Sequence, residues 1–90
     1  MAQAEVLADA LRELGLKIDK VHYKPSVEGA TFTSSYPYVN VTVYPHGDVL
    51  VSALERKMLS HLQDALEVIG YKTTSIYMDP DAGMPSFSAE

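Results

Sequence analysis

Two stretches of the chain repeat apolar residues at the spacing of an amphipathic helix. In residues 2–14 the apolar stripe consists of Val6, Leu7, Ala10, Leu11 and Leu14. The second stripe consists of Leu54, Met58, Leu62, Ala65, Leu66 and Ile69. Glycine follows each stretch, at positions 15 and 70, and glycine commonly ends a helix. Ser52 and Glu55 have the spacing of a capping box, so the second helix is expected to begin there.

Alternating apolar and polar residues predict strands between and after the two helices. The clearest case is residues 38–44, where three valines alternate with polar or aromatic side chains. A turn at 45–48 and a strand at 49–51 follow, so a hairpin with a loop of about four residues is expected. Further strands are predicted at 16–24 and 71–78. The segment 25–37 is expected to be a loop that holds at most a short edge strand at 30–33.

An internal repeat links the two helical regions. Residues 7–25 align without gaps with residues 62–80, and seven of 19 positions are identical. Each copy reads as the second half of a helix, a glycine stop and a strand. Similar caps and stripes recur in any helix–glycine–strand unit, so chance resemblance remains an alternative to duplication. Either origin predicts a quasi-two-fold arrangement of the two units on a shared sheet.

The elements together predict an α+β fold. Two helices are expected to pack on one face of a small, mostly antiparallel sheet, because each has one apolar stripe to bury. The nearest common architecture is ferredoxin-like, with a split β-α-β unit, or a variant that starts with the helix. Residues 1–78 are expected to form a single α+β domain. Residues 79–90 are expected to form a flexible C-terminal tail, because prolines and small polar residues break the strand pattern.

The alternation also predicts which side chains lie on the helix-free face of the sheet. If the valines of residues 38–44 face the helices, the residues between them face away. Tyrosine suits a binding surface because it offers a large contact area and a polar tip, although it is also simply a good strand residue. The predicted partner-binding residues are Tyr38, Asn40, Thr42, Tyr44, Tyr71, Tyr77 and His22. The predicted loop contacts for a small ligand are the hydroxyl residues Thr31, Thr33, Ser34 and Ser35.

Composition and charge narrow the class of protein. With 90 residues and 47% hydrophobic positions, the chain is expected to be one globular domain. The absence of cysteine excludes disulfide scaffolds, iron–sulfur clusters and cysteine nucleophiles. A net charge of −5 argues against direct nucleic-acid binding through phosphate neutralisation. The sequence shows no secretory leader and no apolar run of roughly 20 residues, so a cytoplasmic protein without membrane contact is expected.

Candidate catalytic and metal-binding residues are few. The histidines at 22, 46 and 61 lie on a strand, in a turn and on a helix, without a spacing typical of metal ligands. His46 and Asp48 flank a glycine and are a candidate proton-transfer pair. The acidic turn at 79–83 lacks the further oxygen ligands of a calcium loop. We therefore expect no metal, no cofactor and no catalytic site.

The leading hypothesis is a small, acidic, non-catalytic protein-interaction module. Its tyrosine-rich sheet face is expected to mediate homodimerisation or docking to a partner protein, as in an accessory protein of viral type or a subunit of a larger assembly. One alternative is a small-ligand-sensing regulatory domain that uses the hydroxyl residues at 31–35. A second alternative is an acidic nucleic-acid mimic that inhibits a nucleic-acid-binding protein. A third is a hydrolase or isomerase that uses His46 and Asp48, or His22.

Overall fold

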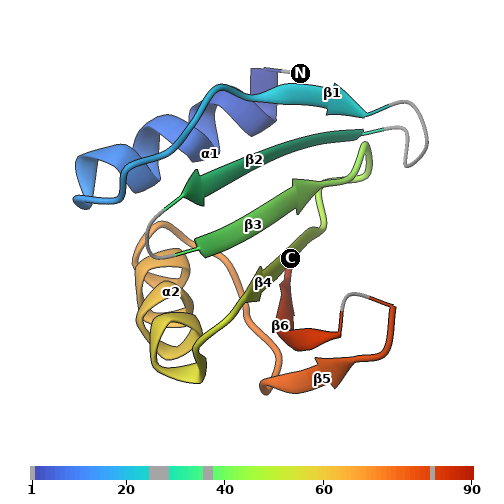
Figure 1. Ribbon diagram of the computed structural model, residues 1–90. Helices are drawn as coiled ribbons and strands as arrows, with labels where there is room; N and C mark the ends of the chain where they lie inside the picture. The colour runs from blue at the N-terminus through green and yellow to red at the C-terminus, as the bar shows by residue number, and fades with distance from the viewer. Residues whose placement is uncertain (1, 25–28, 36–37, 82) are drawn as a thin grey trace.

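The computed structural model describes residues 2–24, 29–35, 38–81 and 83–90. These residues form an α+β fold with two helices and one six-stranded sheet (Figure 1). The sheet has the order β1-β2-β3-β4-β6-β5, and every neighbouring pair is antiparallel. In chain order the elements are α1 (Ala2–Glu13), β1 (His22–Lys24), β2 (Gly29–Ser35), β3 (Tyr38–Val43), β4 (Val49–Ala53), α2 (Arg56–Val68), β5 (Tyr77–Asp79) and β6 (Met84–Ala89).

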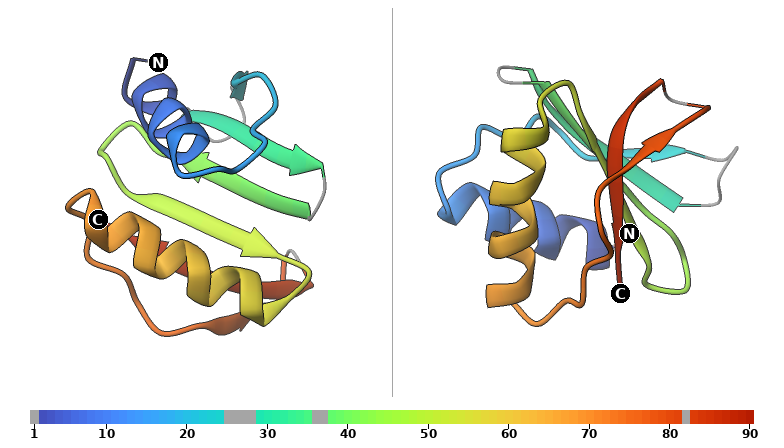
Figure 2. Two further views of the ribbon diagram at one scale, coloured as in Figure 1. Left: turned by 90° about the vertical axis from the view of Figure 1, so that its left-hand side faces the viewer. Right: turned by 90° about the horizontal axis from the view of Figure 1, so that it is seen from below.

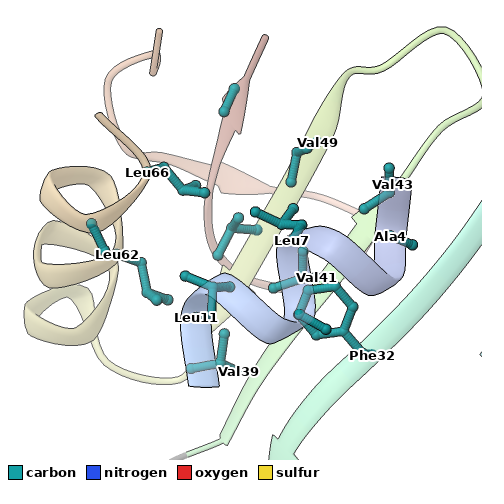
Figure 3. Close-up of a cluster of buried hydrophobic side chains, with 14 of the residues drawn as sticks. Ala4, Leu7, Leu11, Phe32, Val39, Val41, Val43, Val49, Leu62 and Leu66 are labelled. Carbon is teal, nitrogen blue, oxygen red and sulfur yellow. The ribbon is translucent and has the colours of Figure 1, made fainter. Parts of the chain in front are cut away.

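A single hydrophobic core joins the helices to the sheet. Figure 2 shows α1 and α2 on the same side of the sheet, and Figure 3 shows their leucines directed at it. Because side chains alternate along a strand, each central strand contributes every second residue to this core. The largest of the fully buried side chains are Phe32 on β2 and Phe87 on β6. The valines of β3 and β4 fill the space between these phenylalanines.

The buried stripe of each helix differs from the predicted one. In α1 the buried residues are Ala4, Leu7, Ala8 and Leu11, while Val6 is 67% exposed and Leu14 is also exposed. In α2 they are Leu59, Leu62, Ala65 and Leu66, while Leu54 is 66% exposed and Ile69 is also exposed. A helix with several apolar residues offers overlapping stripes, and packing against the sheet selects one of them. In α1 the selected stripe includes two alanines, whose small side chains let the helix approach β2 closely.

The two halves of the chain follow the same plan at a spacing of 55 residues. The helices end at equivalent positions, and Gly15 and Gly70 follow them with φ angles of 102° and 107°. The strands β1 and β5 also coincide at this spacing, and both are sheet edges. His22 pairs with Thr31 in the first half, and Tyr77 pairs with Ser86 in the second, so the strand register is the same.

Backbone hydrogen bonds outside the regular elements also repeat. The amide of Asp19 donates to the carbonyl oxygen of Thr33 at 2.7 Å, and the amide of Thr74 donates to that of Ser88 at 2.8 Å. After each helix, the amide of Leu16 or Tyr71 donates back to the carbonyl oxygen of the last buried leucine. The order of the sheet is likewise symmetric about the boundary between β3 and β4. The structure therefore shows the quasi-two-fold arrangement that the repeat predicted.

Four sequence predictions differ from the structure. The capping box is wrong: Ser52 lies in β4, and Glu55 occupies the N-cap of α2 without a side-chain capping bond. The strands predicted at 16–24 and 71–78 shrink to three residues each. The predicted loop at 25–37 is wrong for residues 29–35, which form β2 between β1 and β3. Residues 25–28 and 36–37 lie outside the described part of the chain.

The predicted flexible tail contains a central strand. Residues 84–89 form β6, which lies between β4 and β5. Phe87 is 0% exposed, and Ala89 and Ser86 are also buried. Pro85 precedes the ladder with β4, which begins at Ser86, so the proline does not interrupt that ladder. Alternating small residues around one phenylalanine are enough for a strand once a partner strand stands on each side.

The topology contains one split β-α-β connection. The chain passes from β4 through α2 to β5, and β6 lies between these two strands. The first half begins with its helix, and β3 occupies the corresponding place beside β2. The sheet has six strands, and the ferredoxin-like assignment of the whole chain is not confirmed.

Candidate functional site

The face of the sheet opposite the core carries small polar side chains. The register aligns one row across the sheet, formed by His22, Thr31, Thr42, Leu50 and Ser88. The next row is formed by Thr33, Asn40, Ser52, Ser86 and Tyr77. Strands β2, β3, β4 and β6 contain no aspartate, glutamate, lysine, arginine or histidine. The middle of this face is therefore uncharged in a chain that is 21% charged.

Two serines of β4 and β6 occupy the middle of the second row. Ser52 and Ser86 lie in the middle of their row, both buried, and their hydroxyl oxygens are 2.8 Å apart in a hydrogen bond. The larger side chains of Asn40 and Tyr77 flank them in the same row.

A hollow of about 380 Å³ lies at one end of this face. Leu50 of β4 and Ser88 of β6 contribute to it from the middle of the sheet. Tyr44, one residue beyond β3, and Tyr77 of β5 stand on the two sides of this pair, as the strand order requires. The hydroxyls of Tyr77 and Ser88 are 3.5 Å apart. We call this space the tyrosine hollow.

The turn between β3 and β4 supplies the remaining lining residues, His46, Asp48 and Val49. Pro45 is the second residue of the turn that starts at Tyr44, a position where proline is common. Gly47 takes a φ of 99°, a left-handed conformation that glycine adopts without strain. The amide of Gly47 donates to the carbonyl oxygen of Tyr44 at 3.0 Å, and the amide of Tyr44 donates to that of Asp48 at 2.9 Å. This tight turn brings the side chains at 46 and 48 together.

His46 forms a polar pair with Asp48 at the end of the hollow. The His46 Nε2 and Asp48 Oδ2 atoms are 2.9 Å apart, with side chains 64% and 47% exposed. The His46 ring also stacks on Tyr44, with centroids 5.7 Å apart and planes inclined by 18°. The pair predicted as a proton-transfer dyad is thus formed. It lies in open contact with water.

Two smaller hollows adjoin the tyrosine hollow and share Asp48 with it. One, of about 320 Å³, reaches past Gly47 to Tyr71 and Glu90. The other, of about 210 Å³, is lined by Lys72, Thr73 and Thr74 and again by Glu90. Asp48 therefore lies where all three meet.

The structure separates the predicted site residues into three groups. On the helix-free face lie His22, Thr31, Thr33, Tyr38, Asn40, Thr42 and Tyr77, with Tyr44 at the adjoining turn. Tyr71 does not join them, because it packs partly buried against the core after α2. Ser34 does not lie on this face either. It faces the core, is buried, and its hydroxyl has no hydrogen-bond partner among the described residues. The side chain of Ser35 lies outside the described part of the structure.

Sequence reasoning missed the middle of the site. Leu50, Ser52, Ser86 and Ser88 form the β4 and β6 part of the face, yet two of them belong to the segment predicted as a tail. The signal for them is the alternation of residues 84–89, which is visible only if a proline is accepted at the start of a strand.

Within the described ranges, no group of three or more histidine, aspartate or glutamate side chains is placed to hold a metal ion. Among the same residues, no helix has the length and apolarity that crossing a bilayer requires.

Comparisons of the chain with protein-family models, with curated proteins and with solved structures found no match. Conclusions about function therefore rest on the sheet face and on the tyrosine hollow.

Proposed function

We propose that this chain is a small, non-catalytic binding module that docks a partner protein on the helix-free face of its sheet. The observation that carries the proposal is the contrast between this face and the rest of the surface. The face has uncharged central strands and exposed tyrosines at its rim, with Tyr38 38% and Tyr77 41% exposed.

Desolvating the central strands of this face costs little, because their own side chains carry no charge to strip of water. Tyrosines at the rim add contact area with few rotatable bonds to immobilise. Depletion of charge and enrichment of tyrosine both characterise the cores of protein interfaces. Buried serines already bonded to each other leave few unsatisfied polar groups when the face is covered.

The size of the face favours a partner protein over a second copy. The 30 residues of the six strands, each about 3.3 Å along the strand and about 4.8 Å from the next strand, cover about 500 Å². Two copies joined by this face would bury about 1,000 Å² in total, near the lower limit for a specific interface. A partner that also fills the tyrosine hollow and contacts the turn at 45–48 would bury more.

A small-ligand-sensing role is the second candidate, and the tyrosine hollow favours it. Its volume of about 380 Å³ lies in the range of ligand pockets. The lining mixes aromatic rings with a carboxylate and two hydroxyl types. Thr31 and Thr33 lie elsewhere on the face, so the ligand contacts of this role would differ from the predicted ones.

The docking proposal is tested by site-specific photo-crosslinking. A benzophenone amino acid at position 77 is expected to capture a defined protein from a lysate of the source organism. The same group at position 68 is the matched control, because Val68 is 78% exposed on α2, outside the sheet face. Capture from both positions, or from position 68 alone, would contradict the proposal.

Solution mass separates docking from self-association. Light scattering on a sizing column is expected to show a monomer across a wide concentration range. A dimer that dissociates in the Tyr38→Ala/Tyr77→Ala variant, but not in Val6→Ala/Val68→Ala, would show that the face binds a second copy instead.

A further inference from the structure

We infer that the tyrosine hollow receives an arginine side chain from the docked partner. The inference rests on the proposed function and names the chemistry of its partner. Three features carry it: the aromatic rings of the hollow, the carboxylate of Asp48 and the distribution of charge around both.

The aromatic rings suit a flat cation. Tyr44 and Tyr77 stand on opposite sides of the hollow, with Leu50 and Ser88 between them. Both a guanidinium and an ammonium group are attracted to the face of a tyrosine ring. Only the planar guanidinium can also stack flat on the ring. The apolar Leu50 suits the aliphatic part of an arginine side chain.

Asp48 offers the matching anion. Its Oδ2 atom pairs with His46 Nε2, and its Oδ1 atom has no hydrogen-bond partner among the described residues. The side chain is 47% exposed, so a ligand can reach it. A guanidinium donates through a fork of N–H groups that fits a carboxylate, and such charge-assisted bonds are among the stronger ones.

The charges near the hollow are compatible with a cationic group. The whole chain carries −5, and the four central strands carry no charge to repel a cation. Lys72 and Glu90, which have opposite charges, line the adjoining hollow together with Asp48. His46 also lines the hollow, and it is already paired with Asp48.

A second copy of the chain is a poor source of this arginine. The chain contains two arginines, Arg12 and Arg56. Arg12 is held by the Asp9 carboxylate and by the carbonyl oxygens of Ile18 and Asp19. Only Arg56, exposed at the start of α2, would be free to enter a neighbouring hollow, so Arg56→Ala tests this source directly.

The test is an amide-shift titration by nuclear magnetic resonance. The probe is a capped pentapeptide of glycine and serine with a central arginine, and the matched probe replaces arginine by citrulline, which has the same shape without the charge. We expect the arginine peptide to shift the amides of Tyr44, Asp48, Leu50, Tyr77 and Ser88 with a dissociation constant of about 1 mM. The citrulline peptide is expected to bind at least about five-fold more weakly.

Variants of the chain test the assigned roles. Asp48→Asn is expected to weaken the arginine peptide at least about five-fold, because it removes the charge and keeps the shape. Asp64→Asn, on exposed α2, is the control for net charge and is expected to change binding less than two-fold. Tyr77→Phe is expected to bind as the unaltered chain does, and Tyr77→Ala to lose binding, since the ring and not its hydroxyl makes the contact.

The outcomes distinguish this inference from the proposed function. Equal binding of the two peptides, shifts outside the hollow or an unaffected Asp48→Asn variant would each overturn the arginine assignment. If crosslinking from position 77 still captures a protein, the docking proposal survives that failure. If both experiments are negative, both fail. A dimer that Arg56→Ala dissociates would assign the hollow to a second copy and overturn the choice of a partner protein.

Discussion

The two halves of this chain share a scaffold and differ in what they present. At a spacing of 55 residues the helix ends, the glycine stops, the edge strands and the register of the following strands all coincide. Phe32 and Phe87 occupy equivalent positions, and both are completely buried. The parts that repeat are those that bury apolar surface and pair the backbone N–H and C=O groups in hydrogen bonds.

The differences lie on the surface of the sheet and at its edges. The first edge strand, β1, begins with His22 and ends with Lys24, whereas β5 begins with Tyr77 and ends with Asp79. The hollow with aromatic sides belongs to the second half and to the turn that precedes it. Gly29 corresponds to Met84, and an added Cβ at Gly29 would collide with the carbonyl oxygen of Val43. The two halves thus share a scaffold but have different sheet edges, and the edge at β5 contributes to the candidate site.

Removing β6 is expected to have the largest effect, because it destroys the equivalence of the two halves of the chain. Deletion of residues 84–90 removes the strand between β4 and β5 and the buried Phe87, so we expect loss of cooperative folding. Circular dichroism during thermal unfolding measures this. Pro80→Ala in the exposed turn before β6 is the control and is expected to unfold cooperatively. A truncated chain that folds like the control would show that the second half is not built like the first.

Truncating the equivalent phenylalanines sharpens the comparison. Phe32→Ala and Phe87→Ala are each expected to lower the free energy of unfolding by about 3–5 kcal/mol, because each leaves a cavity in the shared core. Urea denaturation gives both values. Replacement by leucine at the same positions should cost clearly less, since most of the volume remains. A loss below about 1 kcal/mol at one position and a full loss at the other would refute their equivalence.

Replacing the glycine after each helix is expected to cost less stability than replacing the phenylalanines, and to cost the same in both halves. Gly15 and Gly70 have positive φ angles, and an added Cβ would meet no atom within 4 Å at either. Alanine is therefore expected to cost about 1–2 kcal/mol at each position through backbone strain alone. Asparagine tolerates this conformation better and should recover part of the loss. Unequal costs in thermal unfolding would show that one helix ends under different constraints.

The start of α2 offers the smallest effect, with the opposite sign. Arg56 is the first residue of α2, and Glu55 occupies its N-cap. Glu55 has extended φ and ψ angles of −115° and 129° but makes no side-chain capping bond. Glu55→Ser is expected to raise the free energy of unfolding by about 0.5–1 kcal/mol by capping the helix. Glu67→Ser, near the other end of α2, removes the same charge and should bring no such gain in urea denaturation.

Local patterns in the sequence predicted the helices, the β3–β4 hairpin and the glycine stops. These depend on periodicity and on conformations that only a few residues adopt, and both are visible along the chain. The same patterns failed at β2 and β6. Both strands are short of large apolar residues, and each holds a single phenylalanine between small neighbours. Their strand conformation comes from the partners on either side.

The candidate site was predicted in part for the same reason. Tyr38, Asn40, Thr42 and Tyr77 lie on the expected face because alternation alone assigns them. Tyr71 was assigned by extending the strand too far toward α2. His46 and Asp48 were noted as a pair in a turn, but nothing local to them indicated that Tyr77 and Ser88 would stand beside them.

Periodicity along the chain indicates the helices and the β3–β4 hairpin, and the sequence also contains the repeat at a spacing of 55 residues. The tertiary structure selects the buried stripe of each helix, places β6 inside the sheet and brings Tyr77 of β5 across from Tyr44. The physical reason is that a residue's own preferences act over a few positions of the chain. Strand order and burial depend on contacts between segments far apart in it, such as β4 with β6.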